Sequence, residues 1–324
     1  MSYYYAMNSR ILKQAMVPDT LSGQRLDQVA AKLFPDYSRA RLQSWIKASQ
    51  LLVNGESMRP KDKVYQEDLL AIDSELVAEE SWVAEALPLK VVYQDDALIV
   101  IDKPSGSVVH PAAGHRSGTL LNGLLHQFPE LQYVPRAGIV HRLDKDTTGL
   151  MVVARTLTAH KDLVAQLSDR SVSREYEAVV VNVMTGGGTV NAPLGRNPTN
   201  RKKRAVREDG QEAITHYKVI QRFRAHTHIK VRLETGRTHQ IRVHMSHIHY
   251  PIVGDALYGG RLRVPKACSE ELVMALRNFP RQALHARSLT LRHPISRENI
   301  GWSSELPADM QHLIQALEAD LKCN

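Results

Sequence analysis

Residues 141–155 read HRLDKDTTGLMVVAR and join a polar turn to an apolar strand. Asp and Thr side chains in the turn can hydrogen-bond their own backbone, and Gly149 can adopt a positive φ. The run from Leu150 to Ala154 is short, continuous and apolar, which predicts a buried strand. Asp144 is therefore expected on a loop that a rigid sheet holds in place, which is where active-site residues are often found.

A second segment, residues 233–244, reads LETGRTHQIRVH and repeats the plan of a strand, a glycine turn and closely spaced donors. It has no carboxylate at the turn itself. The first segment thus offers an acid and the second offers cations that could meet it.

Composition fits a nucleic-acid enzyme without identifying one. A chain of 324 residues exceeds one typical domain, so two or more units are expected. The net charge of +8 favours polyanionic partners, although a basic protein without a nucleic-acid role remains open. The two cysteines, Cys268 and Cys323, are far apart and form no CxxC, which argues against a disulfide framework or a zinc site and fits a reducing compartment. Because no stretch approaches a membrane span and residues 1–19 lack a signal peptide pattern, the cytoplasm is expected.

The N-terminal part of the chain changes sharply in charge. Residues 21–66 hold eight Lys or Arg against four acids. This part predicts a helix that opens at Arg25, a second helix capped at Ser38, and a strand that enters a turn over residues 51–55. Residues 64–89 then hold seven acids and no Lys or Arg, which predicts a strand followed by an acidic linker that stays off RNA.

The chain from Leu89 onward is typical of one larger unit that mixes helices and strands. Residues 98–101 predict a buried strand, residues 159–168 an amphipathic helix, and residues 174–181 an alternating strand. Hairpin-like strands outnumber βαβ crossovers. The fold class expected is therefore α+β, with a mixed, mainly antiparallel sheet.

These motifs resemble those of the RluA-type RNA pseudouridine synthases over about residues 20–315. The matching segments are DKPSG at 102–106 with VHP at 109–111, residues 141–154, REYEA at 174–178, residues 235–244, PIVGD at 251–255 and QALHA at 282–286. Residues 21–75 are similar to an S4 RNA-binding module, in which two short helices present cations to the phosphate backbone.

The resemblance implies a division of the chain into an N-terminal tail, an S4-like RNA-binding domain, an acidic linker, a pseudouridine synthase catalytic domain and a C-terminal tail. The boundaries expected are 1–20, 21–75, 76–88, 89–315 and 316–324.

The resemblance also implies an isomerase that acts in ribosome biogenesis. Within the family, the spacing is similar to that of enzymes for the large ribosomal subunit, which implies uridines in the loop of helix 69 of 23S ribosomal RNA. A monomer without metal, cofactor or membrane contact is expected to act on this RNA or on large-subunit particles. A different RNA site is the alternative within the family. A non-catalytic RNA-binding or assembly factor is the alternative outside it, and the joint presence of Asp144, Tyr176 and Arg237 argues against that.

Roles for individual residues follow from the family motifs. Asp144 is expected to act at the ribose, as nucleophile or as base. Burial disfavours a charged carboxylate and a neighbouring guanidinium favours it, so Arg237 is expected to form an ion pair with Asp144. Tyr176 is expected to stack on the flipped base and to help remove the C5 proton. Arg142, with His141 close by, is expected to fill the position that the flipped nucleotide leaves.

Two groups of cations are expected to bind RNA phosphates. In the S4-like domain they are Arg39, Arg41 and Lys47. Residues 196–207 hold six Lys or Arg and no acid, and Asn and Pro residues mark them as a loop. Its cations Arg201, Lys202, Lys203 and Arg204 are expected to grip phosphate beside the active site, with a solvated loop as the alternative.

Two other kinds of site are disfavoured. The pair Asp144 and Asp146 suggests a glycoside hydrolase, which needs a raised-pKa acid as well as a nucleophile or base. One catalytic Asp and one turn-stabilising or RNA-facing Asp fit the pair better. The histidines at 239, 244, 247 and 249 suggest a metal, but their spacing is not HExxH, and Arg237 and Arg242 would repel a cation.

Overall fold

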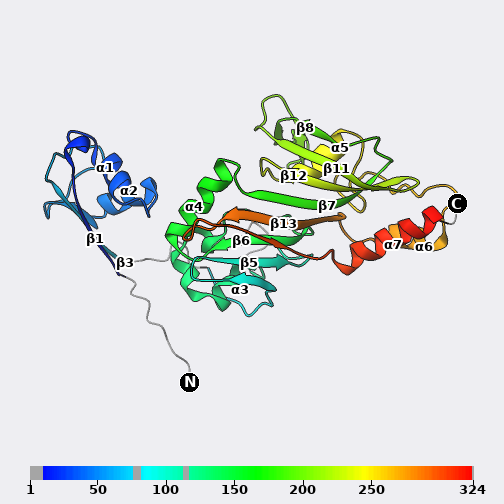
Figure 1. The fold of residues 1–324 in the computed structure, drawn as a ribbon, viewed down its shortest axis with the longest axis horizontal. Helices are drawn as coiled ribbons and strands as arrows, with labels where there is room; N and C mark the ends of the chain where they lie inside the picture. The colour runs from blue at the N-terminus through cyan, green and yellow to red at the C-terminus, as the bar shows by residue number, and fades with distance from the viewer. Residues whose placement is uncertain (1–9, 76–81, 112–116, 323–324) are drawn as a thin grey trace, which may run out of the picture.

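The computed structural model describes residues 10–75, 82–111 and 117–322, which form a small N-terminal unit and a larger second unit (Figure 1). The N-terminal unit packs two helices on a three-stranded antiparallel sheet of order β1-β3-β2. Its elements are β1 (Arg10–Met16), a 3-10 turn (Asp19–Leu21), α1 (Leu26–Leu33), α2 (Arg39–Lys47), β2 (Leu51–Val53) and β3 (Leu69–Glu75). Ser38 caps α2 as predicted, because its Oγ accepts a hydrogen bond from the Arg41 N–H at 3.2 Å.

The second unit is built on a nine-stranded sheet of order β4-β5-β6-β13-β7-β12-β11-β8, with β14 paired to β13. The described pairings are antiparallel except that of β13 with β6, which confirms the predicted mixed, mainly antiparallel sheet. Its strands are β4 (Val91–Gln94), β5 (Leu98–Lys103), β6 (Thr148–Ala154), β7 (Ser173–Val181), β8 (Gly188–Asn191), β11 (Ile214–Arg222), β12 (His226–Leu233), β13 (Leu284–Arg292) and β14 (Asn299–Ser303). A separate hairpin pairs β9 (Leu194–Arg196) with β10 (Arg204–Val206).

Helices pack on this sheet and beyond one end of it, where α6 and α7 lie together (Figure 1). The helices of this unit are α3 (Leu120–Gln127), α4 (Leu157–Ser168), α5 (Gln240–His247), α6 (Glu270–Asn278) and α7 (Ala308–Lys322), with 3-10 turns at Pro129–Tyr133 and Pro135–Gly138.

Strand β6 is the buried strand that the apolar run predicts. Leu150 and Val152 belong to the core that includes α4, whereas Met151 and Val153 belong to the core on the other face, with α3. A strand buried on both faces reads as a continuous apolar run rather than an alternating one. Gly149, at φ +110°, is required at the start of β6, because a Cβ there would lie 2.3 Å from the Ala286 carbonyl oxygen of β13.

The expected domain boundaries need three corrections. The predicted tail over residues 1–20 is wrong for residues 10–16, which form β1 and pair with β3 from Arg10 with Glu75 to Met16 with Leu69; residues 1–9 lie outside the described part. The predicted linker is wrong for residues 82–88, because the Asn122 amide donates to the Val83 carbonyl and Trp82 packs on the larger core; residues 76–81 are not described. The predicted C-terminal tail is wrong up to residue 322, because α7 runs there and buries Leu317.

The two units touch at the N-terminal end of α4. Lys161 Nζ donates to the carbonyl oxygens of Pro35 and Tyr37, the latter at 3.1 Å. Leu157 packs against the N-terminal core. The S4-like unit therefore lies beside the helix that backs β6.

Among the described helices, none combines the length and the apolar character that a membrane crossing requires.

Candidate active site

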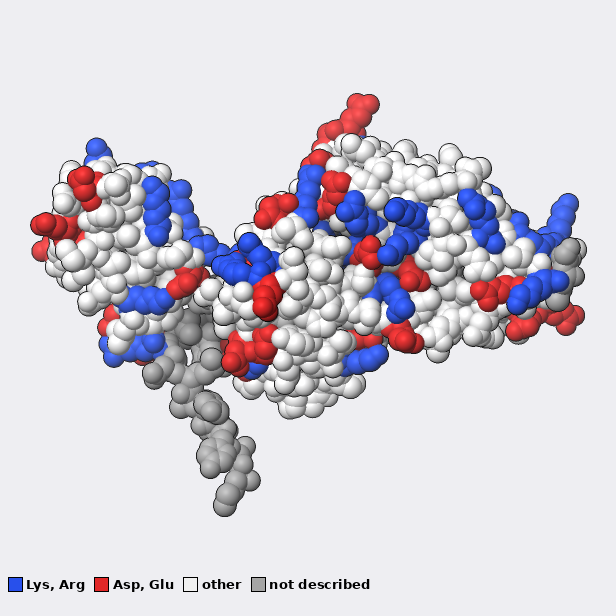
Figure 2. Space-filling model, in the orientation of Figure 1, with Lys and Arg blue, Asp and Glu red and all other residues white. Residues whose placement is uncertain are grey.

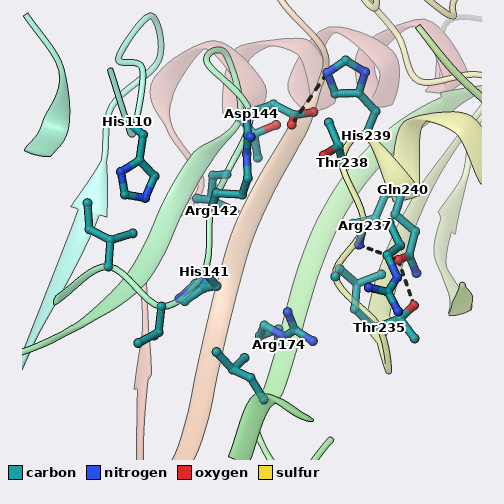
Figure 3. Close-up of a pocket in the computed structure, with 18 of the residues that line it drawn as sticks. His110, His141, Arg142, Asp144, Arg174, Thr235, Arg237, Thr238, His239 and Gln240 are labelled. Atoms are coloured by element: carbon teal, nitrogen blue, oxygen red, sulfur yellow. Dashed lines mark hydrogen bonds and ion pairs between the residues drawn. The ribbon is translucent and has the colours of Figure 1, made fainter. Parts of the chain in front are cut away.

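Asp144 lines a cavity of about 870 Å³ that forms where several strand ends meet. The loop before β6 supplies Asp144, β7 supplies Tyr176, and α5 supplies Arg242. Figure 3 shows Asp144 and Arg142 on one side of the cavity and the segment from Thr235 to Gln240 on the other. The two segments singled out in the sequence therefore face each other, as predicted.

The partner of Asp144 is Arg242. Arg242 Nη1 donates to Asp144 Oδ2 at 3.0 Å, while Nε and Nη2 donate to the two oxygens of Asp255 at 2.7 and 2.9 Å. Asp255 is fully buried and also accepts the backbone N–H groups of Leu257 and Tyr258. Its planar contact with Arg242 fixes the direction of the guanidinium. One nitrogen is then left for Asp144.

Arg242 lies between two carboxylates, Asp144 and Asp255, and the opposite charges stabilise one another. Burial opposes the charge of Arg242, but hydrogen bonds to Asp255 and the charges of Asp255 and Asp144 outweigh it and raise its pKa above the ordinary value. Burial likewise opposes the charge of Asp255, yet Arg242 and two backbone N–H groups lower the pKa of that carboxyl. The guanidinium beside Asp144 is thus permanently charged.

The predicted ion pair between Arg237 and Asp144 is wrong. Arg237 is exposed, and its Nε donates to the Glu212 carbonyl at 3.1 Å while its backbone N–H donates to Gln240 Oε1 at 2.9 Å. The reason is the helix phase: Arg237 lies in the turn before α5, whereas Arg242 lies within the helix and points into the site. Figure 3 shows Arg237 beside Gln240 and Thr235, away from Asp144.

Polar residues of the second segment hold its own turn. Gln240 Oε1 accepts from Thr235 Oγ1 at 2.8 Å, and its Nε2 donates to the Ile214 carbonyl and to Thr215 Oγ1, each at 3.0 Å. These bonds tie the turn to β11. Thr235 and Gln240 thus position α5, and with it Arg242.

The buried ammonium of Lys103 anchors the turn that carries Asp144. Lys103, which is 1% exposed, donates to the carbonyl oxygens of Pro104, Ser107 and Lys145 at 2.8–2.9 Å. Burial lowers the pKa of Lys103 to about 8, with Asp146 and Asp144 opposing the shift, so the ammonium persists at neutral pH.

Two residues just before β13, Arg281 and Gln282, also hold this turn. The Gln282 amide donates to Thr147 Oγ1 at 3.0 Å, and Arg281 donates to the Asp146 carbonyl at 3.2 Å. The DKPSG and QALHA motifs thus have a structural role: Lys103 and Gln282 hold the Asp144 turn and do not enter the site themselves.

The predicted substrate residues lie around the cavity. Tyr176 is buried, and burial, with Asp144 adding to it and Arg174 opposing it, raises its pKa, so the phenol stays protonated at neutral pH. His141 accepts the Val152 N–H at Nε2, at 3.1 Å, and burial and the charge of Arg174 lower its pKa to about 3. His141 is therefore neutral and carries its proton on Nδ1. Arg142 is exposed and has no hydrogen bond or ion pair to another described residue.

The basic loop is a hairpin turn between β9 and β10, and it is anchored beside the site. The Arg204 N–H donates to the Tyr258 hydroxyl at 2.7 Å, and Lys203 Nζ lies 5.9 Å from the Tyr258 ring centre. The same hydroxyl bonds His239 Nδ1 at 2.8 Å, and His239 Nε2 lies 3.9 Å from Asp144 Oδ1. Arg201 and Lys202 are exposed. Phosphate binding by this loop stays a prediction.

The three S4 cations differ in their surroundings. Arg39 donates to the buried carboxylate of Asp27 at 2.6 Å. Arg41 lies 5.9 Å from the Trp45 ring centre, and Lys47 is exposed in the last turn of α2. Arg39 thus also stabilises the S4 fold, and RNA binding by all three stays a prediction.

Sequence reasoning missed three residues that shape the site: Arg242, Asp255 and Tyr258. Arg242 and Asp255 lay in quoted motifs but received no role in the site. A signal was available in the donor-rich segment, since the helix beginning at Gln240 places Arg242 rather than Arg237 on an inward face.

Comparisons with known proteins identify the family to which the chain belongs. Residues 97–247 match the family model "RNA pseudouridylate synthase", and residues 24–70 match "S4 domain". The chain is 57% identical to "Ribosomal large subunit pseudouridine synthase D" of Pseudomonas aeruginosa, over 97% of this chain and 98% of the relative. The protein of the same name from Yersinia pestis is 53% identical over 97% of each chain. The solved structure of "Human RNA Pseudouridylate Synthase Domain Containing 4" is similar with a TM-score of 0.56 and 27% identity, over 71% of this chain and 93% of that chain.

Proposed function

Since the chain belongs to the RNA pseudouridylate synthase family and carries an S4 domain, we propose that it converts specific uridines of 23S ribosomal RNA to pseudouridine, in the loop of helix 69. The chain is an RNA pseudouridine synthase, and its curated relatives carry a name that refers to the large ribosomal subunit. The single observation that supports the chemistry best is the Asp144 carboxylate, 3.0 Å from a buried Arg242 guanidinium at the wall of a large cavity.

The reaction breaks the bond from ribose C1′ to N1 of uracil and forms a bond from C1′ to C5. The proton on C5 is lost and N1 gains one, so the base is isomerised without a net change of atoms or electrons. Asp144 acts at the ribose, as nucleophile at C1′ or as base, and either role needs an ionised carboxylate. Arg242, which Asp255 holds in place, sets a guanidinium beside this carboxylate in a partly closed site.

The target nucleotide has to leave its stack before Asp144 can reach the sugar, at a cost of a few kcal/mol. Arg142 is suited to fill the vacated position because it is exposed and unengaged among the described residues. Tyr176 is suited to stack on the flipped base. The raised pKa of Tyr176 disfavours the phenolate, so removal of the C5 proton by Tyr176 would require a neutral hydroxyl that passes its own proton on.

Cations along one face of the molecule suit an RNA path to this cavity. Figure 2 shows Lys and Arg side chains on the N-terminal unit and across the middle of the second unit, with acids interspersed. We infer that the S4 domain and the β9–β10 loop grip the RNA on either side of the target.

Neutralising the β9–β10 loop by replacing Arg201, Lys202, Lys203 and Arg204 with Gln is expected to weaken RNA binding. The slope of log affinity against log salt should flatten by about 0.7 to 0.9 for each lost phosphate contact. The double variant Arg277→Gln and Lys322→Gln, which removes two exposed charges from α6 and α7, measures the effect per charge of losing cations away from the loop. Equal slopes in both variants and the wild type would mean that the loop does not touch phosphate.

The proposed target is tested by mapping pseudouridine in 23S ribosomal RNA from cells that lack this gene, with and without the wild-type gene restored. Loss of pseudouridine from the helix 69 loop, and its return on complementation, is the expected result. An unchanged helix 69 with loss elsewhere would assign another RNA site. Unchanged pseudouridine throughout the ribosomal RNA would contradict the proposed target altogether.

A further inference from the structure

Arg174 is a buried cation without a counter-charge among the described residues. Its exposed fraction is 7%, and Nε is fully buried without a hydrogen-bond partner. No ion pair or hydrogen bond joins its guanidinium to any other residue that the structure describes. Such burial costs free energy, because the guanidinium loses much of its solvation and no carboxylate among the described residues compensates for the loss. A buried guanidinium without a counter-charge is expected to bind an anionic or polar ligand.

The position of Arg174 indicates which space the ligand occupies. Arg174 and Tyr176 are alternate residues of β7, so both project from the same face of the strand, about 6.6 Å apart, and both line the cavity. Its charge reaches Tyr176 and His141, since it opposes the raised pKa of Tyr176 and adds to the lowered pKa of His141. Figure 3 shows its side chain directed across the cavity towards the segment of Thr235 and Arg237.

The acids that line the cavity do not neutralise Arg174. They are Asp144 and Glu234, and each is paired elsewhere: Asp144 with Arg242, and Glu234 with Arg170 at 3.1 Å and with His216 at 2.6 Å. The missing negative charge therefore has to come from outside the described protein.

Because Gly236 has no side chain, there is room beside it for the Arg174 guanidinium. A Cβ on Gly236 would stand 2.7 Å from Arg174 Nη1, a contact that real Cβ atoms do not make. The glycine of the TGRTHQ turn thus allows the guanidinium to approach the turn closely.

We propose that Arg174 binds a phosphate of the RNA next to the flipped nucleotide, a role that rests on the proposed function. A phosphate supplies the full negative charge that the buried cation lacks, and its oxygens match the guanidinium fork with two parallel hydrogen bonds. A carbonyl oxygen of uracil would accept one hydrogen bond but would leave the charge uncompensated. With Tyr176 on the base and Arg174 on the neighbouring phosphate, β7 would fix both ends of one nucleotide.

The test compares Arg174→Met and Arg174→Lys with the wild type, using a short uridine-containing RNA of the 23S helix 69 sequence. Met keeps the length of the stem and removes the charge. For Met we expect weaker binding and a salt slope lower by about 0.7, the value for one lost contact to a single strand. For Lys the slope should stay, with weaker binding because the fork is lost. Lys218→Gln, an exposed charge on β11 away from the cavity, is the control and should leave both quantities unchanged.

Thermal unfolding separates this role from a structural one. Removing an uncompensated buried charge should leave the Tm of Arg174→Met unchanged or raise it, whereas loss of a structural residue lowers it. Gly236→Ala provides a second route, since the added methyl displaces the guanidinium; its effect on binding should disappear in the Arg174→Met background.

An unchanged salt slope in Arg174→Met would overturn the proposal. In that case weaker binding would assign Arg174 to a neutral group such as a base carbonyl. A lowered Tm with unchanged binding would assign it to the fold. Because slope and Tm need no turnover, these results stand apart from the mapping of pseudouridine, which tests the proposed function itself.

Discussion

Replacing Asp144 with Asn is expected to lower the rate of pseudouridine formation by about 10²- to 10⁴-fold. The affinity for RNA should stay near that of the wild type. Asn keeps the shape of the side chain and loses the charge that both proposed roles at the ribose require. The fold should persist because Arg242 still has its two hydrogen bonds to the buried Asp255. Single-turnover rates and binding constants, measured on the same RNA, check this expectation.

Asp146→Asn is the matched control for Asp144→Asn. The two residues share one turn, yet only the Asp144 carboxylate bonds Arg242. We expect Asp146→Asn to retain most of its rate. A reversal, with Asp144→Asn active and Asp146→Asn inactive, would move the chemistry to Asp146.

Replacing Arg242 is expected to damage both activity and stability. In Arg242→Met the buried carboxylate of Asp255 loses its cation, and breaking a buried pair in this way costs about 3–5 kcal/mol of unfolding free energy. In Arg242→Lys the charge remains, but a single ammonium cannot reproduce the two contacts to Asp255 and the third to Asp144. We therefore expect a folded, less stable Lys variant with little activity. Denaturant unfolding and single-turnover assays measure the two effects.

Arg237→Lys is the comparison that distinguishes the two arginines of this segment. Arg237 is exposed, and among the described residues it donates to the Glu212 carbonyl and, through its own N–H, to Gln240. Its conservative replacement should leave stability unchanged and reduce activity far less than Arg242→Lys does. Should Arg237→Lys prove the more damaging change, the assignment of Arg242 as the partner of Asp144 would lose its support.

The sequence predicted the fold where burial leaves a periodic or continuous apolar pattern. The run that became β6 is apolar at every position because both of its faces are covered, by α4 on one side and α3 on the other. Strand β1 escaped notice because it lies at a sheet edge, where none of its seven residues is fully buried. The α7 helix had a detectable signal in Met310, Leu313 and Leu317, which are spaced at three and four residues and are all buried.

The site was predicted less completely than the fold. Asp144 and the facing cationic segment were both found from residue types on glycine turns. The choice between Arg237 and Arg242 depends on where α5 begins, and a shift of a few residues turns a different side chain inward. The buried state of Asp255 could not be predicted, because it arises only when the residues after α5 fold back beneath the guanidinium. The missing partner of Arg174 is likewise a property of the packed structure.

The position of β13 in the sheet affects when a newly synthesised chain can become active. This strand is among the last of the chain, yet it separates β6 from β7 and joins β6 through only two register pairs, His285 with Thr148 and Ala286 with Gly149. Asp144 lies before β6, whereas Tyr176 lies on β7, so the two stand on opposite sides of that late strand. Loop closures of this length delay folding. We expect a nascent chain that already holds Asp144, Tyr176 and Arg242 to stay inactive until β13 has emerged from the ribosome and inserted.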